Sequence, residues 1–222
     1  MYSERASSLP HVIAWWSVTG PGARESRILP DGCLDIIWKD GRVFVAGPDT
    51  TAQIGRPVLG SRMFALRFSA GTGPPVLGVP ASELVDQQVP LDALWSSAAV
   101  RRLAESSDPM AALTEAARSR WATPDPVMVA LAAASSAGRP IDAIAADCGF
   151  SPRQLLRRSN AAFGYGPKVL ARILRMQRAV GMARAGLPFA AVSASAGYAD
   201  QAHLAREVRA MAGVPLGSLI SS

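Results

Sequence analysis

The pattern of hydrophobic and polar positions divides the chain into a strand-like first part and a helical second part. Up to about residue 80, apolar residues come in short runs rich in β-branched and aromatic side chains, separated by Gly, Pro and Asp. Such runs are typical of short strands joined by tight turns, so they predict a small sheet or a partial barrel. The clearest runs are RILPDGCLDIIW (27–38), RVFVAG (42–47) and RMFALRFS (62–69).

Farther along, the pattern changes to Ala, Leu, Glu and Arg at helical spacing. We interpret GTGPP (71–75) as a turn and not as the start of a helix. Pro90, Pro109 and Pro126 stand where helices are expected to begin, because the first turn of a helix tolerates a fixed φ and a missing N–H. The middle of the chain therefore predicts short helices that link the sheet to the rest of the molecule.

The last third contains an internal repeat. Residues 144–160 and 192–208 align at a constant offset of 48 positions. Each copy predicts a helix, a glycine turn and a second helix. Gly149 and Gly197 fall at the turn, where a sharp change of direction between packed helices often requires a positive φ.

One long helix is predicted between the two copies. PKVLARILRMQRAVGMARAG (167–186) begins with Pro167 and ends at Gly186 and Pro188, and its apolar residues recur at helical spacing. Roughly 18 residues at 1.5 Å each span about 27 Å.

These elements predict an α+β fold. With 222 residues, 49% of them hydrophobic, the chain can bury a real core, and its length suits two small domains better than one large one. We expect a β-rich sheet or partial barrel in residues 1–88 and linking helices in residues 89–137. Residues 138–222 are then an all-α domain of two helix-turn-helix units joined by a long helix.

The charge is concentrated in the second part. The net charge is +6, but the residues from Arg139 onward hold 11 Lys and Arg against 4 Asp and Glu, a net +7, whereas the rest carries −1. A basic region beside a nearly neutral one indicates that one part meets a polyanion. A solvated, arginine-rich surface gives the same charge, so charge alone leaves both interpretations open.

Several functional classes are disfavoured. No window approaches the roughly 18 uncharged apolar residues of a membrane span, and the N-terminus lacks the pattern of an export signal. We therefore expect a cytoplasmic, nucleoid-associated protein. Cys33 and Cys148 could pair, but two cysteines make neither a disulfide scaffold nor a four-ligand zinc site, and we interpret them as structural thiols. No metal or cofactor is predicted.

Catalysis is also disfavoured. Asp31, Asp35 and Asp40 are close in sequence, but the first belongs to a turn and the spacing shows no converging pair of carboxylates. His11 is isolated, and Cys33 has few basic neighbours to lower its pKa. We therefore predict that the chain is not an enzyme.

DNA binding accounts for the arginines of the repeat. A helix-turn-helix unit places its second helix in the major groove, and two units on one rigid helix can reach successive groove faces about 34 Å apart. Arg can pair with guanine and Gln with adenine, while other cations contact phosphates and fix the register.

At these residues, over about 141–219, the chain resembles the AraC/XylS family of transcriptional regulators. The resemblance includes both units, the connecting helix, and the GF and GY turns at the expected offset. It implies a domain that reads a promoter-proximal site with one helix from each unit. By position, the implied base contacts are Arg153, Leu156 and Arg157 of the first unit and Gln201, Ala202, His203 and Arg206 of the second. The phosphate contacts are assigned to Arg158, Lys168, Arg172, Arg178 and Arg209.

The first half resembles a short N-terminal module found on a subset of these regulators. The similarity lies in ILPDGCLDIIW, VFVAGPDT and LGVPASELVDQQVPLDALW, and it implies a β-rich sensor or dimerisation module. Two interpretations of its aromatic residues stay open. Such residues more often form core, and the other interpretation is an apolar pocket in which one charged group, Arg67, orients an anionic ligand. The expected lining is Trp15, Trp38, Phe64 and Arg67, with Trp16, Phe44 and Phe68.

The predicted function is a sequence-specific, double-stranded DNA-binding transcriptional regulator, controlled by a small-molecule effector or a partner at the N-terminal module. RNA polymerase and a second copy of the chain are further candidate partners. Two alternatives are an architectural DNA-binding protein with little sequence preference and a protein-interaction module whose basic half binds an acidic partner. The base-reading residue types at Arg153 and Gln201 favour the first interpretation.

Overall fold

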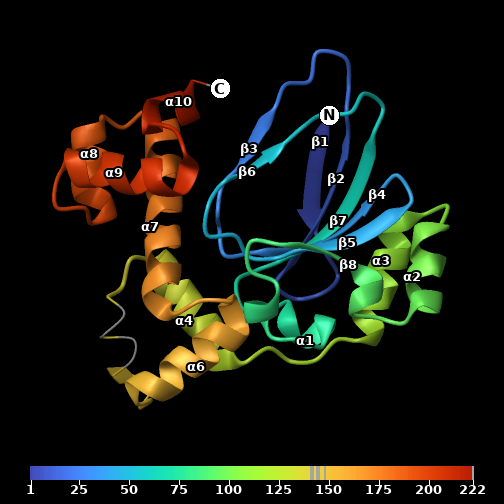
Figure 1. The fold of residues 1–222 in the computed structure, drawn as a ribbon. Helices are drawn as coiled ribbons and strands as arrows, with labels where there is room; N and C mark the ends of the chain where they lie inside the picture. The colour runs from blue at the N-terminus through green and yellow to red at the C-terminus, as the bar shows by residue number, and fades with distance from the viewer. Residues whose placement is uncertain (141–142, 144–145, 148, 222) are drawn as a thin grey trace.

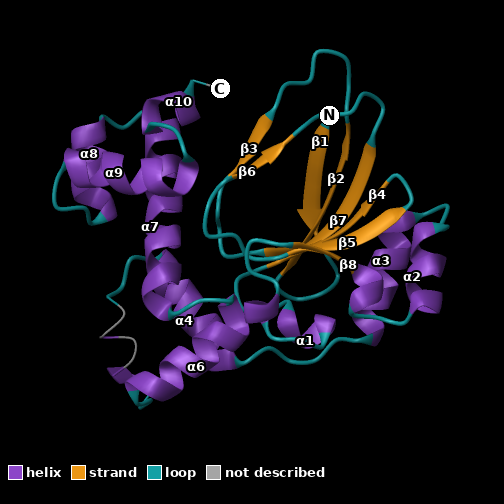
Figure 2. Cartoon of the chain, in the orientation of Figure 1, coloured by secondary structure: helices purple, strands orange, loops and turns teal. Residues whose placement is uncertain are grey.

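A β-sheet body and a helical body lie side by side in the computed structural model, which describes residues 1–140, 143, 146–147 and 149–221 (Figure 1). The strands all belong to the first part of the chain, and the second part is helical (Figure 2). The predicted α+β class is confirmed.

The main sheet has six strands in the order β1-β2-β7-β4-β5-β8, and every neighbouring pair is antiparallel. The three clearest apolar runs of the sequence contain β4, β5 and β7, as predicted. A separate two-stranded ribbon is formed by β3 (Ser26–Ile28) and β6 (Gln53–Gly55). The sheet strands are β1 (Tyr2–Ala6), β2 (Val12–Val18), β4 (Leu34–Lys39), β5 (Arg42–Ala46), β7 (Arg62–Phe68) and β8 (Gln88–Pro90).

One face of the sheet packs against two helices, α2 (Ser97–Ala104) and α3 (Pro109–Ser119). Because side chains alternate along a strand, this face takes every second residue of the central strands. Trp38 of β4 lies opposite Phe64 of β7, with ring centroids 5.7 Å apart. The Trp38 indole N–H also donates to the backbone oxygen of Ala104 over 3.1 Å.

Two local predictions were wrong. Residues 71–75 do open a helix, since the single-turn α1 (Pro74–Leu77) follows Gly73. Pro90 does not begin a helix: it ends β8, where an edge position tolerates the missing N–H, and a 3₁₀ turn, Leu91–Ala93, follows.

The other two prolines are confirmed as helix starts. Pro109 is the first residue of α3, and Pro126 is the first residue of α4 (Pro126–Ser136). Each helix is capped by the aspartate before the proline, because the Asp108 and Asp125 side chains accept backbone N–H bonds from the first turn.

The helical body forms around the long helix α7 (Pro167–Arg184), which confirms the predicted connecting helix. Leu170, Ile173, Met176 and Val180 of α7 are fully or almost fully buried in one core. None of the described helices is long and apolar enough to cross a membrane. The helix expected before Gly149 falls largely outside the described residues. The remaining helices are α6 (Pro152–Phe163), α8 (Phe189–Ala196), α9 (Gln201–Ala212) and α10 (Leu216–Ile220).

The helices of residues 89–137 do not form a layer of their own. α2 and α3 contribute to the core under the sheet, whereas α4 contributes Met128 and Leu131 to the core around α7. Trp121 packs against the core under the sheet, and Val127 packs against the core around α7. Along the chain, the change from one core to the other therefore falls between these two residues.

The two bodies touch near the ends of α6 and α9. Gly164 ends α6 with φ +84°, and a Cβ at this position would collide with Val85 and lie 3.1 Å from the Ala81 oxygen. Only glycine combines this φ with such a close approach. The ribbon and the loop before β6 contact α9: the Ala52 N–H of this loop donates to the Met211 backbone oxygen over 2.7 Å, and Arg27 of β3 donates to the Ala212 oxygen over 2.8 Å.

Candidate nucleic-acid interface and ligand cavity

The second helices of the two units, α6 and α9, have equivalent ends. Each has 12 residues. Ser151 and Gln154 form a reciprocal capping box at the start of α6, and the Asp200 carboxylate caps α9 by accepting the His203 N–H. Because these side chains satisfy the first N–H groups, both helices begin at defined residues beside their turns.

The starts of both helices are exposed. Arg153, Leu156 and Arg157 lie exposed on α6, as Gln201 and Arg206 do on α9. Within the described part of the chain, the polar side chains among them form no hydrogen bond or ion pair. They are therefore available to a partner. Ala202 is likewise exposed.

The long helix α7 separates the two units. α6 lies at one end of α7 and α8 and α9 lie at the other (Figure 1). The 18 residues of α7 correspond to about 27 Å, and the flanking units extend that reach toward the groove repeat of about 34 Å.

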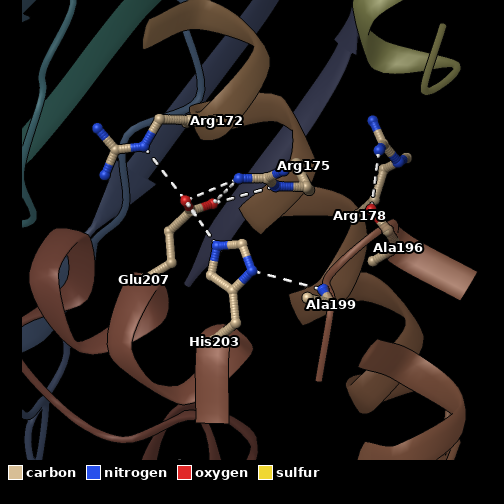
Figure 3. A network of polar contacts seen from close by, with 7 residues as sticks. All are labelled: Arg172, Arg175, Arg178, Ala196, Ala199, His203 and Glu207. Carbon is tan, nitrogen blue, oxygen red and sulfur yellow. Dashed lines mark hydrogen bonds and ion pairs between the residues drawn. The ribbon is translucent and has the colours of Figure 1, made fainter. Parts of the chain in front are cut away.

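A buried carboxylate holds α9 against α7 (Figure 3). The Glu207 side chain is 7% exposed and accepts hydrogen bonds from Arg175 at 2.7 to 3.1 Å and from Arg172 Nε at 3.2 Å. Burial raises the pKa of Glu207, but the hydrogen bonds and charges of Arg175 and Arg172 outweigh burial, so the net pKa is lowered. Glu207 is therefore an ionised group between two cations.

His203 belongs to the same network. Its Nε2 lies 3.8 Å from Glu207 Oε2, and its Nδ1 accepts from the Ala199 N–H at 3.4 Å. Its ring also meets Tyr198 edge-on at 5.2 Å. Both ring nitrogens of this predicted base contact thus face protein atoms, so His203 positions α9 in this structure.

The predicted phosphate contacts fall into two groups. Lys168 and Arg209 are exposed and have no polar side-chain partner within the described residues. The Arg172 side chain is 49% exposed and gives only its Nε to Glu207. These three cations can still reach a phosphate.

The other two predicted phosphate contacts have internal partners. Arg158 pairs with Asp125, with its Nε 2.8 Å from the carboxylate, and its guanidinium lies 4.3 Å from the Phe150 ring centroid. Arg178 donates to the backbone oxygens of Ser135 and Ala196, at 2.8 and 3.3 Å. In this structure the N–H groups of these two arginines tie α6 and α7 to neighbouring segments, and their assignment as phosphate contacts stays a prediction.

The N-terminal module holds a cavity of about 1260 Å³ between the sheet and the ribbon β3–β6. Trp15 and Arg67 line it as predicted, and so does Phe44. Trp38 and Phe64 do not, because they point to the opposite face of the sheet and lie in the core under α2 and α3. Trp16 and Phe68 also pack in that core.

Arg67 is not a free cation in the cavity. Its Nε and Nη2 lie 3.1 and 3.0 Å from the two oxygens of Asp35, and its Nη1 lies 3.5 Å from Asp31. The Trp15 indole N–H also donates to Asp35 over 3.3 Å. Burial raises the pKa of Asp35, and the opposing hydrogen bond and charge of Arg67 do not cancel that rise. The expectation that Arg67 orients an anion therefore does not fit, because its charge is already paired.

Sequence reasoning missed two of these groups, although both left a signal. Asp35 was set aside because the spacing of Asp31, Asp35 and Asp40 shows no converging pair of carboxylates, yet it occupies an inward position of β4 together with Ile37. Glu207 lies on the apolar stripe of α9 with Leu204, Val208 and Met211. A charge on a buried stripe implies an ionic partner.

Among the described residues, no group of His, Cys, Asp and Glu side chains is placed to hold a metal ion. Cys33 is a free, half-buried thiol, and burial raises its pKa. Cys148, its possible partner by sequence, lies outside the described residues.

Residues 144–221 match the model of a helix-turn-helix domain, and residues 7–90 match that of a domain of unknown function, DUF6597. A search of curated proteins gave no significant match. A probable AraC family transcriptional regulator from Rhodopseudomonas palustris is 24% identical over 44% of this chain and 96% of its own, with a TM-score of 0.39. The apo form of a lysine-to-alanine variant of ToxT from Vibrio cholerae is 10% identical over 97% of this chain and 99% of its own, with a TM-score of 0.49. Wild-type ToxT bound to an unsaturated fatty acid is 8% identical over 94% of both chains, at 0.46.

Proposed function

We propose that this chain, a DNA-binding transcriptional regulator of the AraC/XylS family, recognises specific double-stranded DNA sequences under the control of a small molecule bound in its N-terminal module. The observation that carries the proposal is the pair of exposed helix starts on one rigid helix, with Arg153 on α6 and Gln201 on α9 free of internal partners. A side chain that already has internal partners must lose them before it can contact a base.

Base recognition follows from the residue types. Arg153 and Arg157 can each donate two hydrogen bonds to guanine O6 and N7, and Gln201 can pair with adenine N6 and N7. Ala202 is small enough to contact a thymine methyl group. Arg206 lies about one turn beyond Ala202 on the exposed side of α9.

Phosphate contacts fix the register of these helices. Lys168 at the start of α7 and Arg209 on α9 have free ammonium and guanidinium groups, and Arg172 has free Nη groups. Such contacts add affinity and salt dependence without sequence preference.

The ribbon β3–β6 is the element through which a ligand would control DNA binding. Ser26, Ile28 and Ile54 of the ribbon line the cavity. The same ribbon and the loop before β6 hydrogen-bond to the last turn of α9. A ligand that prefers one position of the ribbon therefore shifts the position of α9, and DNA must in turn shift the affinity for the ligand. RNA polymerase and a second copy of the chain stay predictions from the family resemblance.

The test is DNA binding by the full chain on a random duplex pool and on sequences selected from it. The double variant Arg153→Ala, Gln201→Ala should lose at least about tenfold in affinity for selected sequences and much less for random ones. Arg101→Ala, which removes an exposed arginine of α2, is the matched control and should bind like the wild type.

Two outcomes favour other functions. Equal losses on selected and random DNA would indicate an architectural DNA-binding protein. No DNA binding by the wild type under any ligand condition would contradict the proposal and favour a protein-interaction module.

A further inference from the structure

The cavity of the N-terminal module has two chemically different ends. On the sheet face that lines it, Asp35 of β4 lies opposite Arg67 of β7 and Ala46 of β5. Lys39, four residues farther along β4, lies opposite Met63. At about 3.3 Å per residue, these two ends are about 13 Å apart.

An apolar section separates the two ends. Ile37 lies opposite Phe44 on one side and Ala65 of β7 on the other, and Trp15 of β2 lies opposite Ala65 on the far side of β7. Tyr2 of β1 extends this wall, with its ring centroid 5.8 Å from that of Trp15. The section offers aromatic faces to whatever occupies the cavity.

Carboxylates outnumber cations at the first end. Asp31, Asp35, Asp49 and Asp86 line it, whereas Arg67 is paired with Asp35 and Asp31. Asp49 is half-buried and accepts one hydrogen bond, from Gln53 Nε2 at 3.2 Å, and no cation pairs with it within the described residues. A half-buried carboxylate without a cation is costly unless a ligand supplies one.

Among the described residues, four other cationic groups line the cavity; of these, the Met1 ammonium donates to the Val18 oxygen and Arg24 is exposed. Lys39 stands at the opposite end of the strand, and the Arg56 side chain is 83% exposed and lies 3.4 Å from Glu25. Ser17, on β2 opposite Met63, has a buried hydroxyl without a hydrogen-bond partner. The second end therefore suits a polar acceptor and disfavours a second positive charge.

We propose that the cavity binds a small amphipathic cation, with an ammonium or guanidinium head at Asp49 and Asp31 and an apolar body against Trp15, Phe44 and Tyr2. The head supplies the cation that Asp49 lacks, and the aromatic wall favours both an apolar body and a nearby positive charge. An anion of the same shape meets net negative charge at the first end, where the N–H groups of Arg67 already have partners. This assignment rests on the proposed function, because the cation is the effector of that proposal.

The charge of Asp49 makes the binding depend on pH. Burial raises the pKa of Asp49 to about 6, the hydrogen bond from Gln53 opposes the rise, and the negative charges of Asp86, Asp31 and Asp35 add to it. Asp49 is therefore ionised at pH 8 and takes up a proton as the pH falls through about 6. Affinity for a cation should fall over the same range.

The preference of the cavity for a positive charge is tested with three probes that share one apolar body and differ in the head group: phenylbutylamine, phenylbutanol and phenylbutyrate. Calorimetry with the full chain at about pH 8 keeps the amine protonated and Asp49 ionised. The amine should bind at least about tenfold more tightly than the alcohol, and the carboxylate more weakly than both.

Asp49→Asn should lower the affinity for the amine about tenfold, leave that for the alcohol unchanged and remove the pH dependence. Asp92→Asn, which neutralises an exposed acid outside the cavity, is the matched control and should change nothing. Unchanged binding of the alcohol shows that the Asp49 variant keeps its cavity.

Three results would overturn the assignment: tightest binding of phenylbutyrate, no binding of any probe, or an amine preference that survives in Asp49→Asn. DNA binding by the same preparations without probe separates this assignment from the proposed function. If one of these three results is obtained and the wild type still binds specific DNA sequences, only the assigned ligand class is overturned. If the wild type does not bind DNA, the proposed function is overturned, and the ligand assignment falls with it.

Discussion

Helices α6 and α9 have the same length, a side-chain N-cap and a left-handed glycine at the C-terminus, but they differ in their closest contacts with the rest of the molecule. α6 is held by apolar packing and close approach: Phe163 is buried, and Gly164 abuts the N-terminal module. α9 packs into the core around α7 through Leu204, Val208 and Met211, and in addition a buried charge, Glu207, joins it to two arginines of α7.

This difference indicates which unit responds to the N-terminal module. The contact of Gly164 with Val85 and Ala81 is expected to be rigid, because closely packed atoms leave no free volume for movement. The end of α9 meets the ribbon through two hydrogen bonds, one of them from a long arginine side chain. We therefore expect the first unit to anchor the DNA-binding domain and the second to receive the signal from the cavity.

The largest effect should come from Gly164, and Gly213, the glycine that ends the other helix, provides the comparison. Gly164→Ala should lower the free energy of unfolding by about 4 kcal/mol, because a left-handed alanine is strained and its Cβ collides with Val85. Gly213→Ala carries the same strain, but its Cβ would meet only the flexible end of Arg27, at 3.3 Å, so about 1 to 2 kcal/mol is expected. Urea unfolding of both variants measures the difference, and equal losses would remove the distinction between the units.

Next in size is the ion network of α9. Glu207→Gln should lower the free energy of unfolding by about 3 kcal/mol, because it leaves Arg175 partly buried without its counter-charge. Glu115→Gln, which breaks an exposed pair on α3, is the control and should cost less than about 1 kcal/mol.

The pH dependence of the free energy of unfolding shows whether the charge of Glu207 stabilises the fold. Since the pKa of Glu207 is lowered in the folded chain, its stabilisation is complete above the pKa of an unfolded glutamate. It is lost as the pH falls through the lowered value, so the gap between wild type and Glu207→Gln should shrink only in acid. A gap that is constant with pH would show that the carboxylate charge does not matter.

A smaller effect concerns the free side chains of each helix. Arg153→Ala and Gln201→Ala should each relax discrimination at one base pair by about 1 to 3 kcal/mol, and the two base pairs should belong to different half-sites. Lys168→Ala should instead weaken all sequences alike and reduce the salt slope by about 1. Binding to single-base variants of a selected site, at several salt concentrations, distinguishes them; overlap of the two affected base pairs would contradict the assignment of one half-site to each unit.

The smallest effect should come from the ribbon. Arg27→Ala removes one hydrogen bond to the end of α9, which contributes about 1 kcal/mol, so it should reduce the coupling between the cavity ligand and DNA without abolishing either binding event. The coupling is measured as the change in phenylbutylamine affinity caused by DNA. Arg42→Ala, on β5, is the control, and an equal loss of coupling in both variants would exclude the ribbon as the connection.

The sequence predicted three strands that carry strong apolar runs and missed the short strands that do not. β4, β5 and β7 are central or near-central and each contributes buried apolar residues to the sheet, so their composition is diagnostic. β3 is wholly exposed and three residues long, and its pairing with β6 depends on the tertiary structure. No periodicity can be recognised over so few exposed residues.

For the DNA interface and the ligand cavity, the sequence identified the residue types better than the directions in which their side chains point. Both faces of β4 are apolar around Ile36 and Ile37, so the pattern does not tell which face meets helices and which meets the cavity. Trp38 was assigned to the wrong face for this reason. The partners of Arg158 and Arg178 lie far away in sequence, and local spacing cannot distinguish such arginines from Arg153 or Arg209.

The most direct test of the central claim is the selection of bound sequences from a random duplex pool by the purified full chain, at stated salt, with and without phenylbutylamine. We predict enrichment of two short half-sites about one helical turn apart, roughly 34 Å between centres. Tight, salt-sensitive binding without any enriched motif would contradict the claim that α6 and α9 read sequence.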